Sequence, residues 1–276
     1  MPVRLAVTEG FLAPDGAAGA GGMFLSCRPG SFGPAAGQAF PVLAELGVRA
    51  VEIGLPPSAQ VADVRARLER HGLQAASVQI DLDLADPQIE ERAGALAQSA
   101  VEGLGARYLF VSVKTNGRPR PDCYAALRRA GDGAGRHGAT LVIETHPDLV
   151  TNGGVAAETM RGVDHPGVRL NWDPANLEYY NHAPNGRAEF DLVLPWIGAV
   201  HLKDTTGGFE QWAFCTLGQG VVDFPHILGR LEAVGFSGPC TMEIEGVQGE
   251  QLPPEGHVRR VRDSVAYLRS LGYFMA

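Results

Sequence analysis

The sequence predicts an α/β protein built as a closed (β/α)8 TIM barrel, preceded by a short N-terminal extension. From residue 23 onward, short apolar segments alternate with longer segments of helical periodicity, and each kind occurs eight times. The apolar segments are hydrophobic along most of their length, which is typical of strands buried on both faces of a parallel sheet. Eight such units in about 250 residues are the usual size of one barrel domain.

The eight predicted strands are short and are each followed by turn or polar residues. They cover residues 23–27, 49–55, 74–82, 107–113, 140–145, 168–173, 198–204 and 239–246. Their regular spacing leaves room for one helix after each strand, as parallel connections require.

The predicted helices fill those intervals. They cover residues 35–47, 61–72, 89–105, 124–138, 153–163, 188–198, 224–235 and 256–272. Most end in glycine, which accommodates the left-handed conformation that follows a helix C-terminus. A doubly wound open sheet is the alternative, but it usually has fewer strands, and no G-x-G-x-x-G follows the first strand here.

Residues 1–22 stand outside this pattern and are predicted to form the N-terminal extension. "VRLAVTEGFL" has the composition of a strand, and "APDGAAGAGG" that of a flexible linker. Residues 23–276 are predicted to form a single TIM-barrel catalytic domain, because no second composition shift or repeat interrupts them.

Composition and charge exclude several classes of partner. The chain is 45% hydrophobic and 20% charged, with a formal net charge of -8, which disfavours nucleic-acid binding. No apolar run approaches the roughly 18 residues of a membrane span, and the N-terminus lacks the apolar region of a signal peptide. The four cysteines are far apart, which argues against a disulfide scaffold. We expect a cytoplasmic protein.

Four successive predicted strands carry an acid or a histidine near their C-terminal ends, which meet at one rim in such a barrel. These residues are Glu144, Asp173, His201 and Glu243. Several carboxylates in one mouth would repel each other, and a divalent cation removes that penalty. The four residues therefore predict the shell of one metal ion. Mn²⁺, Mg²⁺, Co²⁺ and Fe²⁺ all fit such a shell, and Zn²⁺ is a further alternative.

Glu245 points to the same side of its strand as Glu243, because side chains two residues apart share a face. We favour Glu243 as the ligand because it lies deeper. Glu245 is then expected to lie beside the ligands.

His146 and Lys203 are predicted to bind substrate, because each lies two residues beyond a predicted ligand on the same face. His146 has an alternative role, in which it orients a metal ligand. The alternative for Lys203 is an ion pair with Asp204 or Glu245.

Glu52 and Arg28 complete the predicted substrate-binding residues. Glu52 lies near the end of the second strand and has bracing of the barrel mouth as its alternative role. Arg28 follows the first strand and would meet an anionic group, unless it is a solvated loop charge. Asn176 is expected to cap the turn after the sixth strand.

Two aromatic-rich segments, residues 178–182 and 208–214, are expected to form loops over the mouth. They could act as a lid, as an apolar wall for the substrate, or as the contact of a homo-oligomer.

Five motifs between residues 23 and 272 resemble the sugar phosphate isomerase/epimerase family, the xylose isomerase-like TIM barrels. They are, in order, "LVIETH", "NWDPANL", "AVHLKD", "LGQGVVDF" and "GPCTMEIEG". The resemblance implies that Glu144 and Glu243 are catalytic as well as ligands of one divalent ion. It also implies a sugar isomerase or epimerase acting on a polyhydroxy carbonyl compound, with glutamate-mediated proton transfer through a metal-stabilised enediolate.

Two other functions remain open at the level of sequence. The same scaffold carries lyases, such as inosose or 3-dehydroshikimate dehydratases and enzymes that cleave C-glycosides, so a sugar or cyclitol is the expected substrate. A non-catalytic sugar-binding subunit is the third hypothesis. Many ketose epimerases of the family have a histidine shortly after the aspartate of strand six, whereas Pro174, Ala175 and Asn176 follow Asp173 here.

Overall fold

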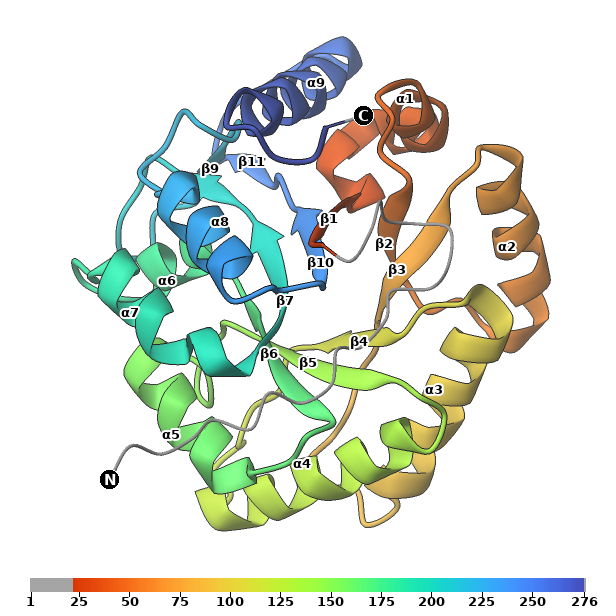
Figure 1. The fold of residues 1–276 in the computed structure, drawn as a ribbon, viewed down its shortest axis with the longest axis vertical. Helices are drawn as coiled ribbons and strands as arrows, with labels where there is room; N and C mark the ends of the chain where they lie inside the picture. Colours follow the sequence, from red (N-terminus) through yellow and green to blue (C-terminus); the bar gives the residue numbers. More distant parts are fainter. Residues whose placement is uncertain (1–21, 276) are drawn as a thin grey trace.

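The computed structural model describes residues 22–275. Eight parallel strands close into a barrel in the order β1-β10-β7-β6-β5-β4-β3-β2, with helices on the outside (Figure 1). The predicted (β/α)8 barrel is therefore confirmed. The strand and the linker predicted for the N-terminal extension fall in residues 1–21, outside the described residues.

The barrel strands are slightly shorter than the predicted ones. They are Phe24–Cys27 (β1), Ala50–Gly54 (β2), Gln74–Gln79 (β3), Tyr108–Val111 (β4), Thr140–Glu144 (β5), Val168–Trp172 (β6), Ile197–Leu202 (β7) and Pro239–Met242 (β10). A small antiparallel sheet lies apart from the barrel in the order β11-β9-β8. It consists of Asp204–Thr205 (β8), Ala213–Cys215 (β9) and Gly246–Val247 (β11). Because β8 follows β7 and β11 follows β10, this sheet stands at the C-terminal ends of those two strands.

The helices follow the strands in the predicted alternation. The α-helices are Ala39–Glu45 (α1), Val61–Arg70 (α2), Ile89–Leu104 (α3), Arg120–Gly135 (α4), Gly153–Val163 (α5), Pro174–Tyr180 (α6), Gly186–Val193 (α7), Phe224–Ala233 (α8) and Pro254–Ser270 (α9). Three 3₁₀ segments add Pro29–Gln38 (η1), Ser58–Gln60 (η2) and Leu194–Trp196 (η3). The helix predicted over 188–198 ends earlier than expected, because Pro195 lies in η3 and β7 already begins at Ile197.

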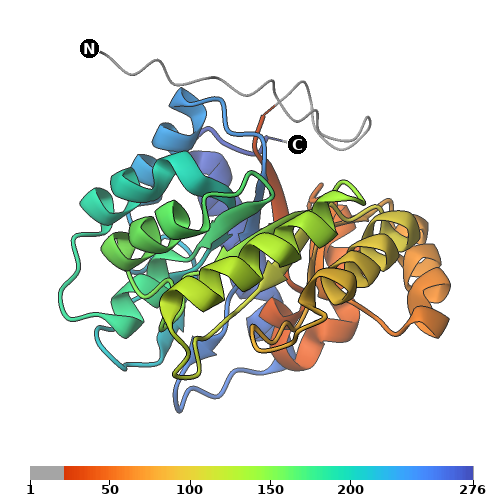
Figure 2. The same cartoon turned by 90° about the horizontal axis from the view of Figure 1, so that it is seen from below.

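Helices α3 and α4 pack side by side, as the yellow and yellow-green helices of Figure 2 show. Their close approach depends on Gly133, where an added Cβ would lie 2.1 Å from the backbone oxygen of Glu90. Any other residue at this position would force the two helices apart.

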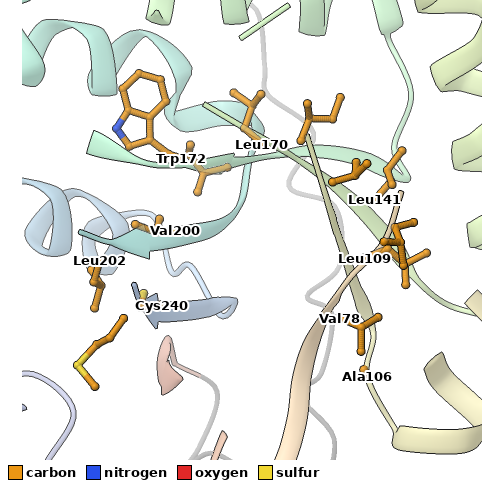
Figure 3. Packing of buried hydrophobic residues seen from close by; sticks show 14 of the residues in the cluster. Val78, Ala106, Leu109, Leu141, Leu170, Trp172, Val200, Leu202 and Cys240 are labelled. Atoms are coloured by element: carbon orange, nitrogen blue, oxygen red, sulfur yellow. The ribbon is translucent and has the colours of Figure 1, made fainter. Parts of the chain in front are cut away.

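Alternation along the strands separates two apolar layers. Outward-facing residues such as Leu141, Leu170 and Val200 join the main core between the barrel and the helices (Figure 3). Phe110, Val142 and Ala199 form a separate small cluster inside the barrel. Residues two positions beyond these inner residues point inward as well. The polar residues at the C-terminal ends of the strands therefore also point into the barrel, above the inner cluster.

Within residues 22–275, none of the helices combines the length and the hydrophobicity that crossing a bilayer would require.

Candidate metal centre

The four predicted ligands lie together inside the C-terminal mouth of the barrel. Glu144, Asp173, His201 and Glu243 each offer one ligand atom, and these atoms all lie within 4.8 Å of one another. All four side chains are buried. They come from the ends of four neighbouring strands, β5, β6, β7 and β10. Each lies an even number of residues from an inward-facing position on its strand, so the strand pleat aims them at a common point.

His201 is held from behind by Glu52. The imidazole Nε2 lies 3.0 Å from Glu52 Oε1, and Ser77 Oγ donates to Glu52 Oε2 at 2.5 Å. The ring also packs on Phe110, with centroids 4.8 Å apart. With Nε2 donating to a carboxylate, Nδ1 is the nitrogen that faces the centre.

Nδ1 of His201 has several acceptors nearby but makes no hydrogen bond. It lies 3.2 Å from Glu243 Oε2 and 3.7 Å from Glu144 Oε1. Burial alone would lower the pKa of His201, but the charges of Glu243 and Glu52 and its other carboxylate neighbours raise it well above its usual value.

Asp173 uses its two carboxylate oxygens differently. Oδ1 caps α6 by accepting from the backbone N–H groups of Ala175 at 3.0 Å and Asn176 at 2.9 Å. Oδ2 is buried and has no hydrogen-bond partner. The backbone N–H of Asp173 donates to Thr145 Oγ1 at 2.9 Å, which fixes where β6 ends. One residue therefore begins a helix and also presents an unpaired oxygen to the centre.

Asn176 does not cap the turn, contrary to the sequence expectation, because Asp173 already fills that role. Its side chain instead points back to the strand ends. Nδ2 donates to the Thr145 carbonyl at 3.1 Å and lies 3.4 Å from Glu144 Oε1, while Oδ1 accepts from Lys203. Glu144 receives a further hydrogen bond from the Ser112 hydroxyl. Asn176 and Ser112 thereby fix the orientation of the Glu144 carboxylate.

Glu243 lies between two cations. Arg28 Nη1 donates to its Oε1, and Lys203 Nζ lies 3.3 Å from its Oε2. Burial pushes the pKa of Glu243 upward, but the positive charges of Lys203, His201 and Arg28 hold it well below its usual range. The carboxylate is therefore ionised.

Lys203 is 3% exposed and bridges several groups. Its Nζ donates to Asn176 Oδ1 at 3.1 Å, forms an ion pair with Glu245, and lies 3.6 Å from Asp173 Oδ2. Burial would lower the pKa of Lys203, but the surrounding carboxylates raise it. Asp204 and Glu245 were the two ion-pair partners predicted for Lys203, and Glu245 is the one that forms the ion pair. The substrate contact predicted for Lys203 stays a prediction.

Asp204 turns away from Lys203 to organise the loop before α8. Its carboxylate accepts the backbone N–H groups of Gly218 and Gly220, each at 2.9 Å, and of Val222 at 3.1 Å. A Cβ on Gly220 would lie 2.2 Å from Asp204 Oδ1. This close approach explains why the second glycine of the "LGQGVVDF" motif, Gly220, has no side chain.

The other predicted substrate residues occupy different depths of the mouth. Glu52 is 2% exposed, with both oxygens engaged, so its geometry favours holding His201 over contacting substrate. Arg28 retains 23% of its side-chain exposure and also donates to Gln79 Oε1 at 2.5 Å. His146 lies further out, and its Nε2 pairs with the Tyr180 hydroxyl. Arg28 is thus the predicted substrate residue that both contacts Glu243 and reaches solvent.

The unpaired atoms at the centre fit a divalent cation. His201 Nδ1 and Asp173 Oδ2 are buried polar atoms without a hydrogen bond, and such atoms are costly unless something pairs with them. Three carboxylates and one imidazole form an oxygen-rich donor set that suits a hard or borderline divalent ion.

The aromatic residues of segments 178–182 and 208–214 form one wall beside this centre. Tyr179 packs edge-on against Trp212 and also contacts Phe214, with ring centroids 5.9 and 5.8 Å away. Lys203 Nζ lies 4.2 Å from the Phe214 ring centroid. Segment 178–182 is partly helical, since α6 extends to Tyr180, and β9 covers the end of the second segment.

Sequence reasoning missed several supporting residues, and strand register could have found one of them. Ser77 is the direct neighbour of Glu52 in the pairing of β2 with β3. Asn176 and Tyr180 lie three and seven residues after Asp173, which is the spacing of one helix face. This spacing was not recognised because α6 was not predicted as a helix.

Residues 40–271 match the family described as xylose isomerase-like TIM barrel. The chain belongs to this family. The match covers most of the described residues and all four residues of the centre.

Among curated proteins, the chain is 30% identical over 142 residues to L-ribulose-5-phosphate 3-epimerase UlaE of Salmonella paratyphi C. That alignment covers 50% of this chain and 47% of the relative, so the chain spans about half the length of the curated relatives it matches.

Two solved structures share the fold over nearly the whole chain. D-allulose 3-epimerase from Methylomonas sp. is 20% identical with a TM-score of 0.68, covering 91% of this chain and 98% of that one. The probable 3-DHS dehydratase AsbF from Bacillus anthracis is 15% identical with a TM-score of 0.69, covering 90% and 99%. At these identities the likeness concerns the fold.

Proposed function

We propose that this protein is a divalent-metal-dependent sugar isomerase or epimerase acting on a polyhydroxy carbonyl compound. The observation that carries the proposal is the convergence of Glu144, Asp173, His201 and Glu243 within 4.8 Å at the barrel mouth. A passive sugar-binding subunit would have no need for three buried carboxylates around one imidazole, because their mutual repulsion is costly.

Glu144, Asp173, His201 and Glu243 would hold the ion, with Mn²⁺ as the first candidate. When bound, a divalent ion acts as a Lewis acid that polarises a substrate carbonyl and makes the neighbouring C–H more acidic. The unpaired His201 Nδ1 and Asp173 Oδ2 support this assignment.

Glu144 and Glu243 are the proposed proton-transfer residues. They stand on β5 and β10, which are separated in the barrel by β6 and β7, so they approach the centre from different sides. One carboxylate would remove the proton from the carbon beside the carbonyl, and the other would return a proton. Ser112 and Asn176 orient Glu144, while Arg28 and Lys203 orient Glu243.

The relatives named above support an epimerase. UlaE is named as a 3-epimerase of a ketose phosphate, and the Methylomonas structure as a 3-epimerase of a free ketose. Both names describe inversion at a carbon next to a carbonyl, which is the chemistry that two glutamates around a cation can perform. We extend only this reaction class to the present chain.

A lyase is the second candidate, and two observations favour it. The dehydratase AsbF matches the fold as well as the epimerase does. In addition, Pro174, Ala175 and Asn176 occupy the positions after Asp173, where the family's ketose epimerases often carry a histidine. A dehydratase would need an acid aimed at the leaving hydroxyl.

Two measurements test the proposal. Metal analysis of the purified protein should give about one divalent ion per chain, as a single four-residue shell implies. The metal-loaded protein is then incubated in deuterated water with D-allulose, D-fructose, L-ribulose 5-phosphate, an inosose and 3-dehydroshikimate. Deuterium incorporation without loss of water indicates an isomerase or epimerase, whereas loss of water indicates the lyase. Neither reaction, together with no bound metal, would refute the catalytic proposal.

Three sequence predictions remain proposals that this experiment does not address. They are a cytoplasmic location, the absence of nucleic-acid and membrane partners, and a homo-oligomer formed through the aromatic segments over the mouth. Fractionation, binding assays with nucleic acid and vesicles, and light scattering would test them in turn.

A further inference from the structure

His146 and Tyr180 form a hydrogen-bonded pair at the edge of the mouth. The Tyr180 hydroxyl lies 2.7 Å from His146 Nε2, and the two rings meet edge-on with centroids 4.7 Å apart. The other ring nitrogen, Nδ1, lies 3.1 Å from the carbonyl oxygen of Pro147. Both nitrogens of His146 are therefore occupied.

These contacts fix the tautomer of a neutral His146. A carbonyl oxygen can only accept a hydrogen bond, so Nδ1 must carry the hydrogen that Pro147 receives. Nε2 is then an acceptor, and the Tyr180 hydroxyl must donate to it. Burial and the nearby carboxylate of Glu144 raise the pKa of Tyr180 to about 12, so the phenol keeps its proton at neutral pH.

Helix α6 connects this pair to the metal centre. Asp173 caps the helix, Asn176 contacts Glu144 and Lys203, and Tyr180 is the last residue of the helix. Spacings of three and four residues place these side chains on one face. Asn181 anchors the helix end by donating to the carbonyls of Leu177 at 2.9 Å and Thr151 at 2.8 Å.

We propose that Tyr180 is a positioning residue that holds His146 in the Nδ1–H tautomer and that the pair accepts a hydrogen bond from a substrate hydroxyl. With its hydrogen committed to Nε2, the phenol oxygen keeps a lone pair with which it can only accept. The pair therefore selects a substrate that carries a free hydroxyl at this edge over one that lacks it. The hydroxyl contact rests on the proposed function, whereas the tautomer assignment does not.

The tautomer is tested by NMR on protein labelled with ¹⁵N-histidine and loaded with diamagnetic Mg²⁺, because the two ring nitrogens are distinguished by which one carries the hydrogen. His146→Gln assigns the resonances. We expect His146 in the Nδ1–H form, a shifted Nε2 resonance in Tyr180→Phe, and unchanged His146 resonances in the neighbouring control Tyr179→Phe. A wild-type Nε2–H tautomer, or a Tyr180→Phe spectrum identical to that of the wild type, would overturn the assignment.

The hydroxyl contact is tested by kinetics with whichever compound of the panel exchanges deuterium. Tyr180→Phe should lower kcat/KM roughly 10-fold, the usual size of one lost hydrogen bond. Tyr273→Phe, whose hydroxyl lies 3.5 Å from Glu232 on the exterior, is the control. An unchanged kcat/KM in Tyr180→Phe would refute the contact. If no compound reacts and the protein binds no metal, the proposed function and the hydroxyl contact that rests on it are both refuted, while NMR still decides the tautomer.

Discussion

The two halves of the barrel mouth contribute different things to the centre. Strands β5, β6, β7 and β10 supply all four of its ligand atoms. Strands β2 and β3 supply Glu52 and Ser77, which lie behind His201, and the end of β4 supplies Ser112, which contacts Glu144. The half that contains β5, β6, β7 and β10 presents the ligand atoms. The half that contains β2, β3 and β4 orients two of the ligand side chains, His201 and Glu144.

This division shows how three carboxylates and one imidazole can be accommodated together in one small buried volume. Each ligand side chain is constrained by a neutral or oppositely charged group on another strand or on a helix, and Lys203 lies among three carboxylates. Preorganisation of this kind is what a metal centre requires of its surroundings. Mutations in the two halves should therefore have different consequences.

The largest effect is expected from Glu144→Gln in the donor half. The amide keeps the shape of the side chain but cannot take a proton, so deuterium exchange should fall by about 10²- to 10⁴-fold. Exchange rates in deuterated water measure this loss. Glu158→Gln on the exposed side of α5 is the matched control and should retain full exchange. Equal rates in the two variants would exclude Glu144 from proton transfer.

Lys203→Met should unfold more easily than the wild type, by about 3–5 kcal/mol in metal-free protein, because three carboxylates lose their shared cation. Added Mn²⁺ should restore part of that stability by binding only the folded state. Urea unfolding with and without Mn²⁺ measures both effects. Lys114→Met, which replaces the other lysine of the chain at an exposed site, should change little. Failure of Mn²⁺ to stabilise either variant would argue against the centre.

Glu52→Gln tests the supporting half. The hydrogen bond that orients His201 is weakened while all four ligand atoms remain, so metal affinity should fall by about 10- to 100-fold. Competition with a fluorescent chelator gives the affinity. Glu69→Gln on the exterior of α2 is the control. A wild-type affinity in Glu52→Gln would show that the two halves act independently.

The smallest effect concerns Asp148, which joins the loops after β4 and β5 at the boundary of the two halves. Burial raises the pKa of Asp148, but hydrogen bonds from the Thr115 hydroxyl and backbone N–H outweigh it and lower the pKa. A carboxyl with a lowered folded pKa stabilises the protein above its unfolded pKa and ceases to do so as the pH falls through its folded value.

Asp148→Asn should therefore cost no more than about 1 kcal/mol at pH 7, because solvent screens this carboxyl. The difference in unfolding free energy from the wild type should shrink below about pH 3.8, the ordinary pKa of aspartate. Urea titrations at several pH values measure it. A difference that stays constant down to pH 3 would mean that the carboxylate charge does not matter.

Much of the fold could be predicted from the sequence because buried strands and amphipathic helices leave periodic signals. The positions of Glu144 and His201 near the C-terminal ends of their predicted strands likewise indicated that they meet at one rim of the barrel. The contacts of Asn176 and Tyr180 could not be predicted because α6 is only seven residues long and starts at a proline after its own cap. The pairing of Glu52 with His201 joins residues 149 positions apart, and no local pattern encodes that distance.

Asp173 couples folding to ion binding in a single side chain. An asparagine there would still offer an oxygen to the first turn of α6, since amide and carboxylate oxygens cap equally well, but it would remove one negative charge from the cation's cage. Under the proposed function, this single exchange would weaken the cation site while leaving the first turn of α6 capped.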